Sequence, residues 1–329
     1  MWNVVGHSWA VDSLGQGIAV GHVAHAYLFL GPVQVGKRTL ALELAKALNC
    51  LNEVSERPCG VCLACQKVAR LTHPDVRVVE PREGSLKIEQ VRQLQREIAL
   101  TPYEGRYRVA ILPDFDQATV EAANCLLKTL EEPPPQVVLC LTAQGTSSLL
   151  PTIVSRCQLL HLRPLSLATV ASVLVQRWGA EQEKAQLLAR LSEGRLGWAV
   201  KALQDPSMLR HRTDCLDALV SLLGEVRVAR FSYAEGMSRT PQEVPGLLEI
   251  WLSWWRDLLL AREGSLGEII GLDRGHEIAQ YAARYSLDQI LAALKAIRTA
   301  QRQLDWNANP RLTLEALLLS LPFGSSPKG

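Results

Sequence analysis

Four cysteines between residues 50 and 65 have the spacing that most directly suggests chemistry. They follow the pattern C-x8-C-x2-C-x2-C and are Cys50, Cys59, Cys62 and Cys65. Two-residue gaps let neighbouring thiolates point at one centre, and four sulfur ligands suit tetrahedral zinc. Because such a site keeps no open ligand position, we expect a structural zinc that folds the insert at 50–65 and activates no water.

Two other interpretations of these cysteines are weaker. Four unpaired thiols in an irregular loop are unusual at this density. A redox C-x2-C pair would be expected at the start of a helix that follows a strand. The remaining cysteines are scattered over apolar segments, where we expect small core residues: Cys125, Cys140, Cys157 and Cys215.

A second candidate site surrounds Lys37. An apolar run over 27–30 ends at Gly31, and a loop then leads through Gly36 into a helical pattern from Thr39 to Leu48. A strand, a glycine-bounded loop and a helix form a phosphate-binding loop, in which backbone N–H groups and the helix N-terminus hold phosphate. The pattern predicts that the phosphate contacts come from Gly31, Gly36, Lys37 and Thr39.

The positions that would face magnesium are altered. Arg38 stands where a phosphate-binding loop has Ser or Thr, and the strand at 109–112 is followed by Pro113 and Asp114 in place of an Asp-Glu pair. The loss of both positions indicates a degenerate site that does not hydrolyse ATP. Two possibilities stay open: the loop binds ATP without turning it over, or it is kept only for its strand–helix turn.

Arg156 is the third candidate. It follows a turn and precedes an apolar segment at 158–162, so we expect its guanidinium at the domain edge. A permanently charged planar fork at a subunit boundary is the usual form of an arginine finger, which neutralises charge developing on a γ-phosphate. Taken alone, a single edge arginine is more often an ordinary solvated or salt-bridged residue.

The elements that position these residues alternate between strands and helices up to about residue 163. Helical spacing covers 8–21, 39–48, 88–98 and 118–131, and apolar strand segments cover 27–30, 76–79, 109–112, 137–141 and 158–162. Strands that are apolar throughout are typical of a parallel sheet covered on both faces. We therefore predict an α/β domain over 1–163.

After Pro164 the strand signal disappears. Three short helices predict a small lid over 164–205, and longer helical patterns predict an all-α domain over 206–329 with a frayed tail at 325–329. A stripe around Trp251, Trp254 and Trp255 indicates mainly the core of that bundle, and a face of this size is also suited to a contact with partner helices. Four arginines of this region are expected on solvated faces: Arg227, Arg230, Arg298 and Arg302.

Composition narrows the class of protein. The chain has 329 residues and a formal charge of +2, which favours several domains and argues against nucleic-acid binding through bulk charge. No apolar run reaches the roughly 18 residues of a membrane span, and the start lacks the pattern of a signal peptide. We therefore expect a soluble cytoplasmic protein without a membrane partner.

Several segments together carry a family resemblance. They are His25-Ala-Tyr-Leu-Phe29, the four-cysteine insert, Ala122-Ala-Asn-Cys-Leu-Leu-Lys-Thr-Leu-Glu-Glu-Pro133 and Ser155-Arg156-Cys157. As a set they resemble the delta-prime subunit family of bacterial DNA polymerase III, part of the clamp-loader group of AAA+ proteins. The resemblance is firm over residues 5–205 and looser across the C-terminal helices.

The resemblance implies roles for individual residues. Arg156, with its motif neighbours Ser155 and Cys157, would act in trans on ATP bound by a neighbouring motor subunit. Thr142 matches the sensor-one place, and Gly197 falls where motor subunits carry the arginine of the sensor-two motif. The four cysteines match the zinc ligands of the family.

The resemblance also implies a function and partners. The chain would be an accessory subunit without ATPase activity of its own, which scaffolds a hetero-oligomeric loader through a C-terminal helical collar. The loader places the sliding clamp on primed DNA during replication, so the partners would be the gamma/tau motor subunits, the delta subunit, the clamp and, through the assembled complex, primed DNA.

Two alternatives remain. A self-sufficient motor-type ATPase would need Asp114 to hold magnesium and Thr39 to supply the missing hydroxyl. A zinc-based nucleic-acid-binding module is weaker, because aromatic and basic residues do not alternate around the cysteines.

Overall fold

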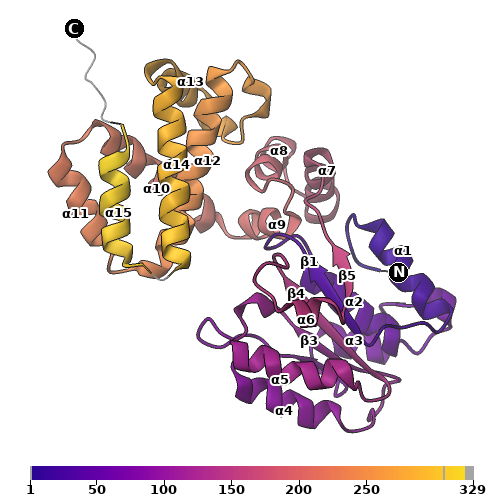
Figure 1. Cartoon of the computed structure of the whole chain (residues 1–329). Coiled ribbons are helices and arrows are strands. Elements are labelled where there is room, and N and C mark those ends of the chain that lie inside the picture. Colours follow the sequence, from indigo (N-terminus) through magenta and orange to yellow (C-terminus); the bar gives the residue numbers. More distant parts are fainter. Residues whose placement is uncertain (1, 307, 323–329) are drawn as a thin grey trace. The chain divides into compact units, whose positions relative to one another are not determined.

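The computed structural model describes residues 2–306 and 308–322 and divides into two compact units (Figure 1). The first unit contains the residues up to Ser166 together with Gly194–Trp198, and the second contains Leu167–Glu193 and the residues from Ala199 onward. A separate lid over 164–205 stays a prediction. The tail at 325–329 lies outside the described residues.

A parallel five-stranded sheet forms the centre of the first unit, in the order β2-β3-β4-β1-β5. In the register of β1, Leu28 lies opposite Leu141 of β4 and Leu159 of β5. This arrangement confirms the predicted α/β class. The strands are β1 (Ala26–Leu30), β2 (Val76–Val78), β3 (Arg108–Leu112), β4 (Val137–Ala143) and β5 (Gln158–His161).

Helices cover both faces of this sheet (Figure 1). Leu28 of β1 belongs to the core formed with α4 and α5, whereas Tyr27 and Phe29 belong to the core formed with α1 and α2. Successive side chains of a strand point to opposite faces, which explains why the inner strand β1 is apolar throughout, whereas β2 and β5 at the sheet edges also carry polar residues. The helices are α1 (Ser8–Ala19), α2 (Lys37–Asn49), α3 (Leu63–Ala69), α4 (Ile88–Ile98), α5 (Val120–Glu131) and α6 (Pro151–Val154).

The second unit is helical, and the side chains of Trp251, Trp254 and Trp255 are buried in its core as predicted. Among the described residues, no helix has both the length and the apolar composition needed to cross a membrane. The helices are α7 (Leu167–Trp178), α8 (Gln182–Leu191), α9 (Leu196–Gln204, which begins in the first unit), α10 (Pro206–Gly224), α11 (Arg227–Met237), α12 (Val244–Arg262), α13 (Gly275–Arg284), α14 (Leu287–Asp305) and α15 (Pro310–Ser320).

Arg230 corrects one expectation. Its side chain is not solvated but buried, with 1% of the residue exposed. The guanidinium donates to the carbonyl of Leu222 near the end of α10 (3.0 Å) and to those of Leu318 and Leu321 at the end of α15. The last carbonyls of a helix lack partners within the helix and carry partial negative charge. Arg230 therefore binds two helix ends together inside the core.

Candidate functional sites

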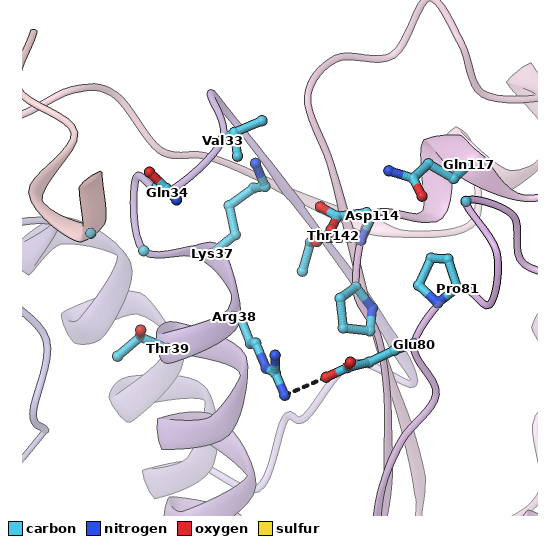
Figure 2. A pocket seen from close by; sticks show the side chains of 14 residues that line it. Val33, Gln34, Lys37, Arg38, Thr39, Glu80, Pro81, Asp114, Gln117 and Thr142 are labelled. Atoms are coloured by element: carbon cyan, nitrogen blue, oxygen red, sulfur yellow. Dashed lines mark hydrogen bonds and ion pairs between the residues drawn. The ribbon is translucent and has the colours of Figure 1, made fainter. Parts of the chain in front are cut away.

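The loop between β1 and α2 borders an open pocket of about 440 Å³ (Figure 2). Gly36 precedes α2 with φ of 114°, in the left-handed region that favours glycine, and α2 begins at Lys37, two residues earlier than the pattern indicates. Three of the predicted phosphate-loop residues line the pocket, and Gly31 does not. The lining includes Gly36, Lys37, Thr39, Pro113, Asp114 and Thr142.

The Lys37 ammonium is bound by its own loop. Its Nζ donates to the carbonyl of Gly31 and to that of Pro32 at 2.8 Å. Burial lowers the pKa of Lys37, while the nearby charges of Asp114 and Asp116 act in the opposite direction. Two backbone carbonyls therefore occupy donors that a bound phosphate would use.

The magnesium side of the pocket carries an ion pair in place of a hydroxyl. The Arg38 guanidinium meets Glu80, from the loop after β2, at 2.6 Å (Figure 2). Pro113 lines the pocket without offering a carboxylate. Asp114 follows with φ of 46°, and its N–H donates to the Thr142 hydroxyl at 3.0 Å. Thr142, which was predicted at the sensor-one place, thus holds the backbone of Asp114. Asp114 is the residue that would have to bind magnesium in the motor-type alternative.

Gly197 packs directly on the phosphate loop. Its N–H donates to the Gln34 carbonyl at 3.0 Å, and a Cβ atom built at position 197 would lie 2.7 Å from that same oxygen. Real Cβ atoms do not approach a backbone oxygen so closely. An arginine at this position, as expected in a motor subunit, would therefore require the contact with Gln34 to shift.

The four cysteines of the insert come together. Their sulfur atoms all lie within 4.8 Å of one another, and those of Cys50 and Cys62 are 3.9 Å apart. A tetrahedral centre with Zn–S bonds of ~2.3 Å separates its sulfurs by ~3.8 Å. The cluster can therefore hold a metal ion, and it fits a zinc site.

The surroundings of these thiols change their pKa values in different directions. The N–H of Cys62 donates to the Cys59 sulfur at 3.3 Å and lowers the pKa of Cys59 to about 6, whereas burial raises the pKa of Cys65. Cys62 immediately precedes α3, and Cys65 lies within it. The sequence reading missed α3, because a short helix in a segment rich in turn-forming residues shows no clear helical spacing.

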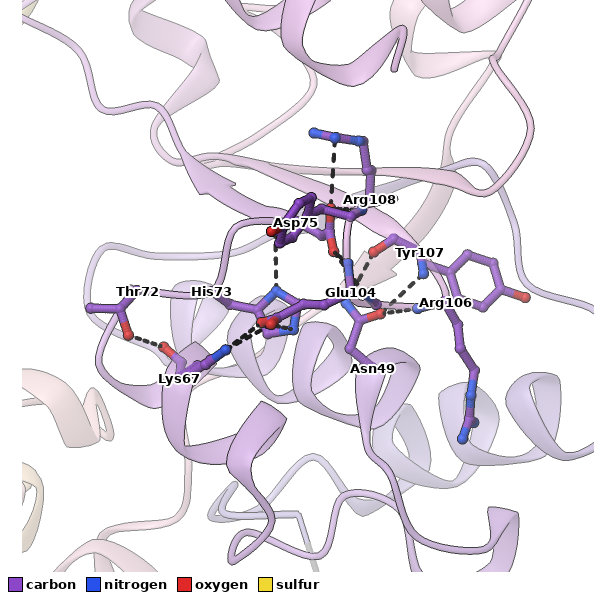
Figure 3. Close-up of polar contacts among 11 residues, drawn as sticks. Asn49, Lys67, Thr72, His73, Asp75, Glu104, Arg106, Tyr107 and Arg108 are labelled. Carbon is purple, nitrogen blue, oxygen red and sulfur yellow. Dashed lines mark hydrogen bonds and ion pairs between the residues drawn. The ribbon is translucent and has the colours of Figure 1, made fainter. Parts of the chain in front are cut away.

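A polar network adjoins the cysteine cluster (Figure 3). Asn49, the last residue of α2, accepts through Oδ1 from the N–H groups of residues 106 and 107, at 2.9 and 3.0 Å. The Asp75 carboxylate accepts from the N–H groups of residues 103, 104 and 105, at 2.7, 2.9 and 2.7 Å. Two side chains thus hold residues 103–107 of the loop between α4 and β3.

Asp75 is the electrostatic centre of this network. Burial alone would raise the pKa of Asp75, but the three backbone N–H groups and the charge of Arg108 outweigh it and hold the pKa below its usual range. On the other side of the loop, Glu104 pairs with Lys67 of α3 at 2.7 Å. The loop is therefore tied to the end of α2 and to α3, on either side of the cysteine cluster, a connection that the sequence did not indicate.

Arg156 lies outside the phosphate pocket, half-exposed beyond the end of α6. Its Nη2 meets the Glu131 carboxylate at 2.9 Å, and its Nη1 donates to the Thr152 carbonyl at 3.0 Å. Of its motif neighbours, Ser155 donates its hydroxyl to the same carbonyl at 3.1 Å, and burial raises the pKa of Cys157 to about 12. Glu131 was not singled out from the sequence, although it lies in one of the motif segments.

Comparisons with known proteins agree over most of the chain. Residues 6–166 match the family described as DNA polymerase III, delta subunit, and residues 208–322 match DNA polymerase III, delta subunit, C terminal. The chain is 30% identical to DNA polymerase III subunit delta′ of Bacillus subtilis over 308 residues, which cover 92% of each protein. It is 33% identical to the subunit delta′ of Pseudomonas aeruginosa over 309 residues, covering 91% of this chain and 93% of the relative.

One solved structure is similar over nearly the whole chain. It is a DNA polymerase III gamma subunit-related protein from Thermotoga maritima, with a TM-score of 0.52 and 18% identity, covering 94% of this chain and 97% of the other. At this identity the likeness concerns the fold alone.

Proposed function

Because the chain belongs to the delta-prime subunit family of DNA polymerase III, we propose that it is a non-hydrolysing clamp-loader subunit that lends Arg156 to a neighbouring ATP site. In this proposal it scaffolds the loader beside the gamma/tau motor subunits and the delta subunit. The assembled loader places the sliding clamp on primed DNA. The phosphate chemistry then takes place on nucleotide held by another chain.

The state of the phosphate loop is the observation that carries this proposal. Lys37 is bound by loop carbonyls, and Arg38 is paired with Glu80. ATP hydrolysis at such a loop needs a lysine on the phosphates and a hydroxyl and a carboxylate on magnesium. Here the lysine is engaged elsewhere, and Arg38 and Pro113 offer neither magnesium ligand.

The position of Arg156 supports the second half of the proposal. Its guanidinium is half-exposed and lies outside this chain's own phosphate pocket. A guanidinium stays charged at any physiological pH and presents a planar fork to phosphate oxygens. An arginine finger supplied by a neighbouring chain neutralises charge that develops on the transferred γ-phosphate.

For the cysteine cluster we propose zinc, held by Cys50, Cys59, Cys62 and Cys65. Four thiolates leave no open coordination position, so the ion would contribute structure and no catalysis. It would join the end of α2 to α3 and so support the loop that Asp75 and Asn49 hold.

A reconstituted ATPase assay tests the proposal. The chain alone should show negligible turnover, and adding it to motor subunits should raise their DNA- and clamp-dependent ATPase activity. Arg156→Ala should remove most of that gain, because arginine fingers contribute roughly 10³–10⁵ in rate in GTPase examples. Lys37→Ala should leave the gain unchanged. The control is Arg77→Ala, which removes another surface arginine paired with a glutamate.

Two results would contradict the proposal. One concerns the trans arginine finger, and the other concerns the absence of ATP hydrolysis by this chain. A full gain with Arg156→Ala excludes the trans arginine finger. Magnesium-dependent turnover by the chain alone, abolished by Lys37→Ala, favours the motor-type alternative in which Asp114 and Thr39 hold magnesium.

A further inference from the structure

The guanidinium of Arg156 is held along one side only. Its Nη2 meets the Glu131 carboxylate, and its Nη1 donates to the Thr152 carbonyl and, at 3.4 Å, to the Ser155 hydroxyl. Its Nε–H has no acceptor within the described part of the chain. One edge of the fork is therefore fixed, and the other has a donor available for an incoming anion.

Arg77 shows how an arginine with a structural role differs. Its Nε and Nη2 both donate to the Glu97 carboxylate, at 2.7 and 3.1 Å, in a two-point fork. That arrangement uses the edge that recognises carboxylates and phosphates. Arg156 carries an ion pair of similar length, but its partner leaves the Nε–H donor unused.

Glu131 and Thr152, which hold Arg156, are each followed or preceded in the chain by a core residue. Glu131 ends α5 directly after the buried Leu130, and Thr152 precedes Ile153, which is fully buried. Leu130 and Ile153 belong to the same core cluster. Packing therefore sets the Thr152 carbonyl and the backbone from which the Glu131 carboxylate extends, and the longer arginine side chain adapts to them.

From this geometry we propose that Glu131 is a positioning residue for Arg156. It restricts the rotamers of the guanidinium and keeps the Nε–H edge available to the phosphate of the neighbouring subunit. Holding a flexible arginine before the reaction reduces the side-chain entropy lost when the charge must be in place. This inference rests on the proposed role of Arg156 as a trans arginine finger.

A carboxylate beside the finger also has an opposing effect, because it lowers the positive potential that meets the phosphate. Both side chains are partly exposed, with 36% of Arg156 and 51% of Glu131 accessible. Solvent and salt screen the charge of such a pair. Orientation acts regardless of that screening, so positioning is expected to be the larger effect.

The test uses the reconstituted loader with Glu131→Ala and Glu131→Gln. Glu132→Ala is the matched control, since Glu132 is adjacent and exposed and has no side-chain partner among the described residues. Glu131→Ala should lower the kcat of the stimulated ATPase about 2- to 5-fold, the range expected for an exposed pair, with KM for ATP nearly unchanged. Glu131→Gln keeps a hydrogen-bond acceptor, so its kcat should lie between that of Glu131→Ala and that of the unmodified chain.

A double variant separates this inference from the proposed function. Combined with Arg156→Ala, Glu131→Ala should cause no further loss, because the group that it positions is gone. If Glu131→Ala and Glu132→Ala gave equal kcat values for the stimulated ATPase, or if Glu131→Ala raised kcat, the positioning role of Glu131 would be overturned. The proposed role of Arg156 would not be affected. Full stimulation by Arg156→Ala would overturn both. Thermal unfolding of each variant checks that the fold is unchanged.

Discussion

The two ends of α2 differ in what they hold. At the N-terminal end, Lys37 is bound by loop carbonyls and Arg38 by Glu80, so the cations of a phosphate loop are engaged within the chain. At the C-terminal end, Asn49 holds the loop before β3, and Cys50 belongs to the sulfur cluster. At both ends of α2, side chains therefore hold neighbouring loops, and under the proposed function this structural role replaces nucleotide chemistry at the N-terminal end.

Loss of metal should have the largest effect. Structural zinc contributes ~10–16 kcal/mol of binding free energy in zinc-finger peptides, so Cys62→Ser should strongly lower the free energy of unfolding. Urea unfolding and metal analysis of protein purified under reducing conditions measure this. The matched control is Cys125→Ser, a half-buried cysteine outside the cluster. If Lys37→Ala lowered the free energy of unfolding more than Cys62→Ser, the C-terminal end of α2 would not be the end that contributes more to stability.

Asp75→Ala should come next, with a loss of about 3 kcal/mol, because the buried carboxylate accepts from three partly buried N–H groups that would lose their acceptor. Since the folded pKa of Asp75 lies below the unfolded value, its contribution is present above the unfolded pKa and is lost as pH falls through the folded pKa. Urea unfolding at neutral and acidic pH should therefore show a smaller difference between variant and parent in acid. Asp12→Asn, on the exposed face of α1, is the control. A constant difference at all pH values would contradict the role of the carboxylate.

The smallest loss of stability is expected at Gly197, which contacts the loop before the N-terminal end of α2. Gly197→Arg should destabilise the fold by about 1–3 kcal/mol and should not create ATP binding, because its Cβ would meet the Gln34 carbonyl. Gly15→Ala, at a position in α1 with nothing within 4 Å, should be neutral or stabilising. Thermal unfolding with and without ATP measures both. Unchanged stability together with ATP-dependent stabilisation of Gly197→Arg would show a loop ready for nucleotide.

The sequence was sufficient to predict the elements of the sheet and the altered phosphate loop. The apolar runs at 27–30, 109–112 and 137–141 predicted a sheet covered on both faces, and Arg38 and Pro113 can be recognised by position alone. The four cysteines could be grouped because their spacing is short. All of these are local signals.

What could not be predicted depends on partners distant in the sequence. Nothing near Glu131 indicates that it meets Arg156, and nothing near Glu80 indicates that it meets Arg38. The helical pattern around Arg230 also could not show that the residue faces the core, because its acceptors belong to other helices. Gly197 could be recognised as a missing arginine, but its contact with Gln34 could not.

Arg230 has a consequence for the order in which the chain is built during synthesis. Two of its acceptors, the carbonyls of Leu318 and Leu321, lie 88 and 91 residues further along the chain. While translation proceeds, the guanidinium cannot make these two contacts until the end of α15 has left the ribosome. The strands of the sheet are complete by His161, so the first unit can fold well before this. Arg156 and the four-cysteine cluster can therefore be in place before the helical unit is finished.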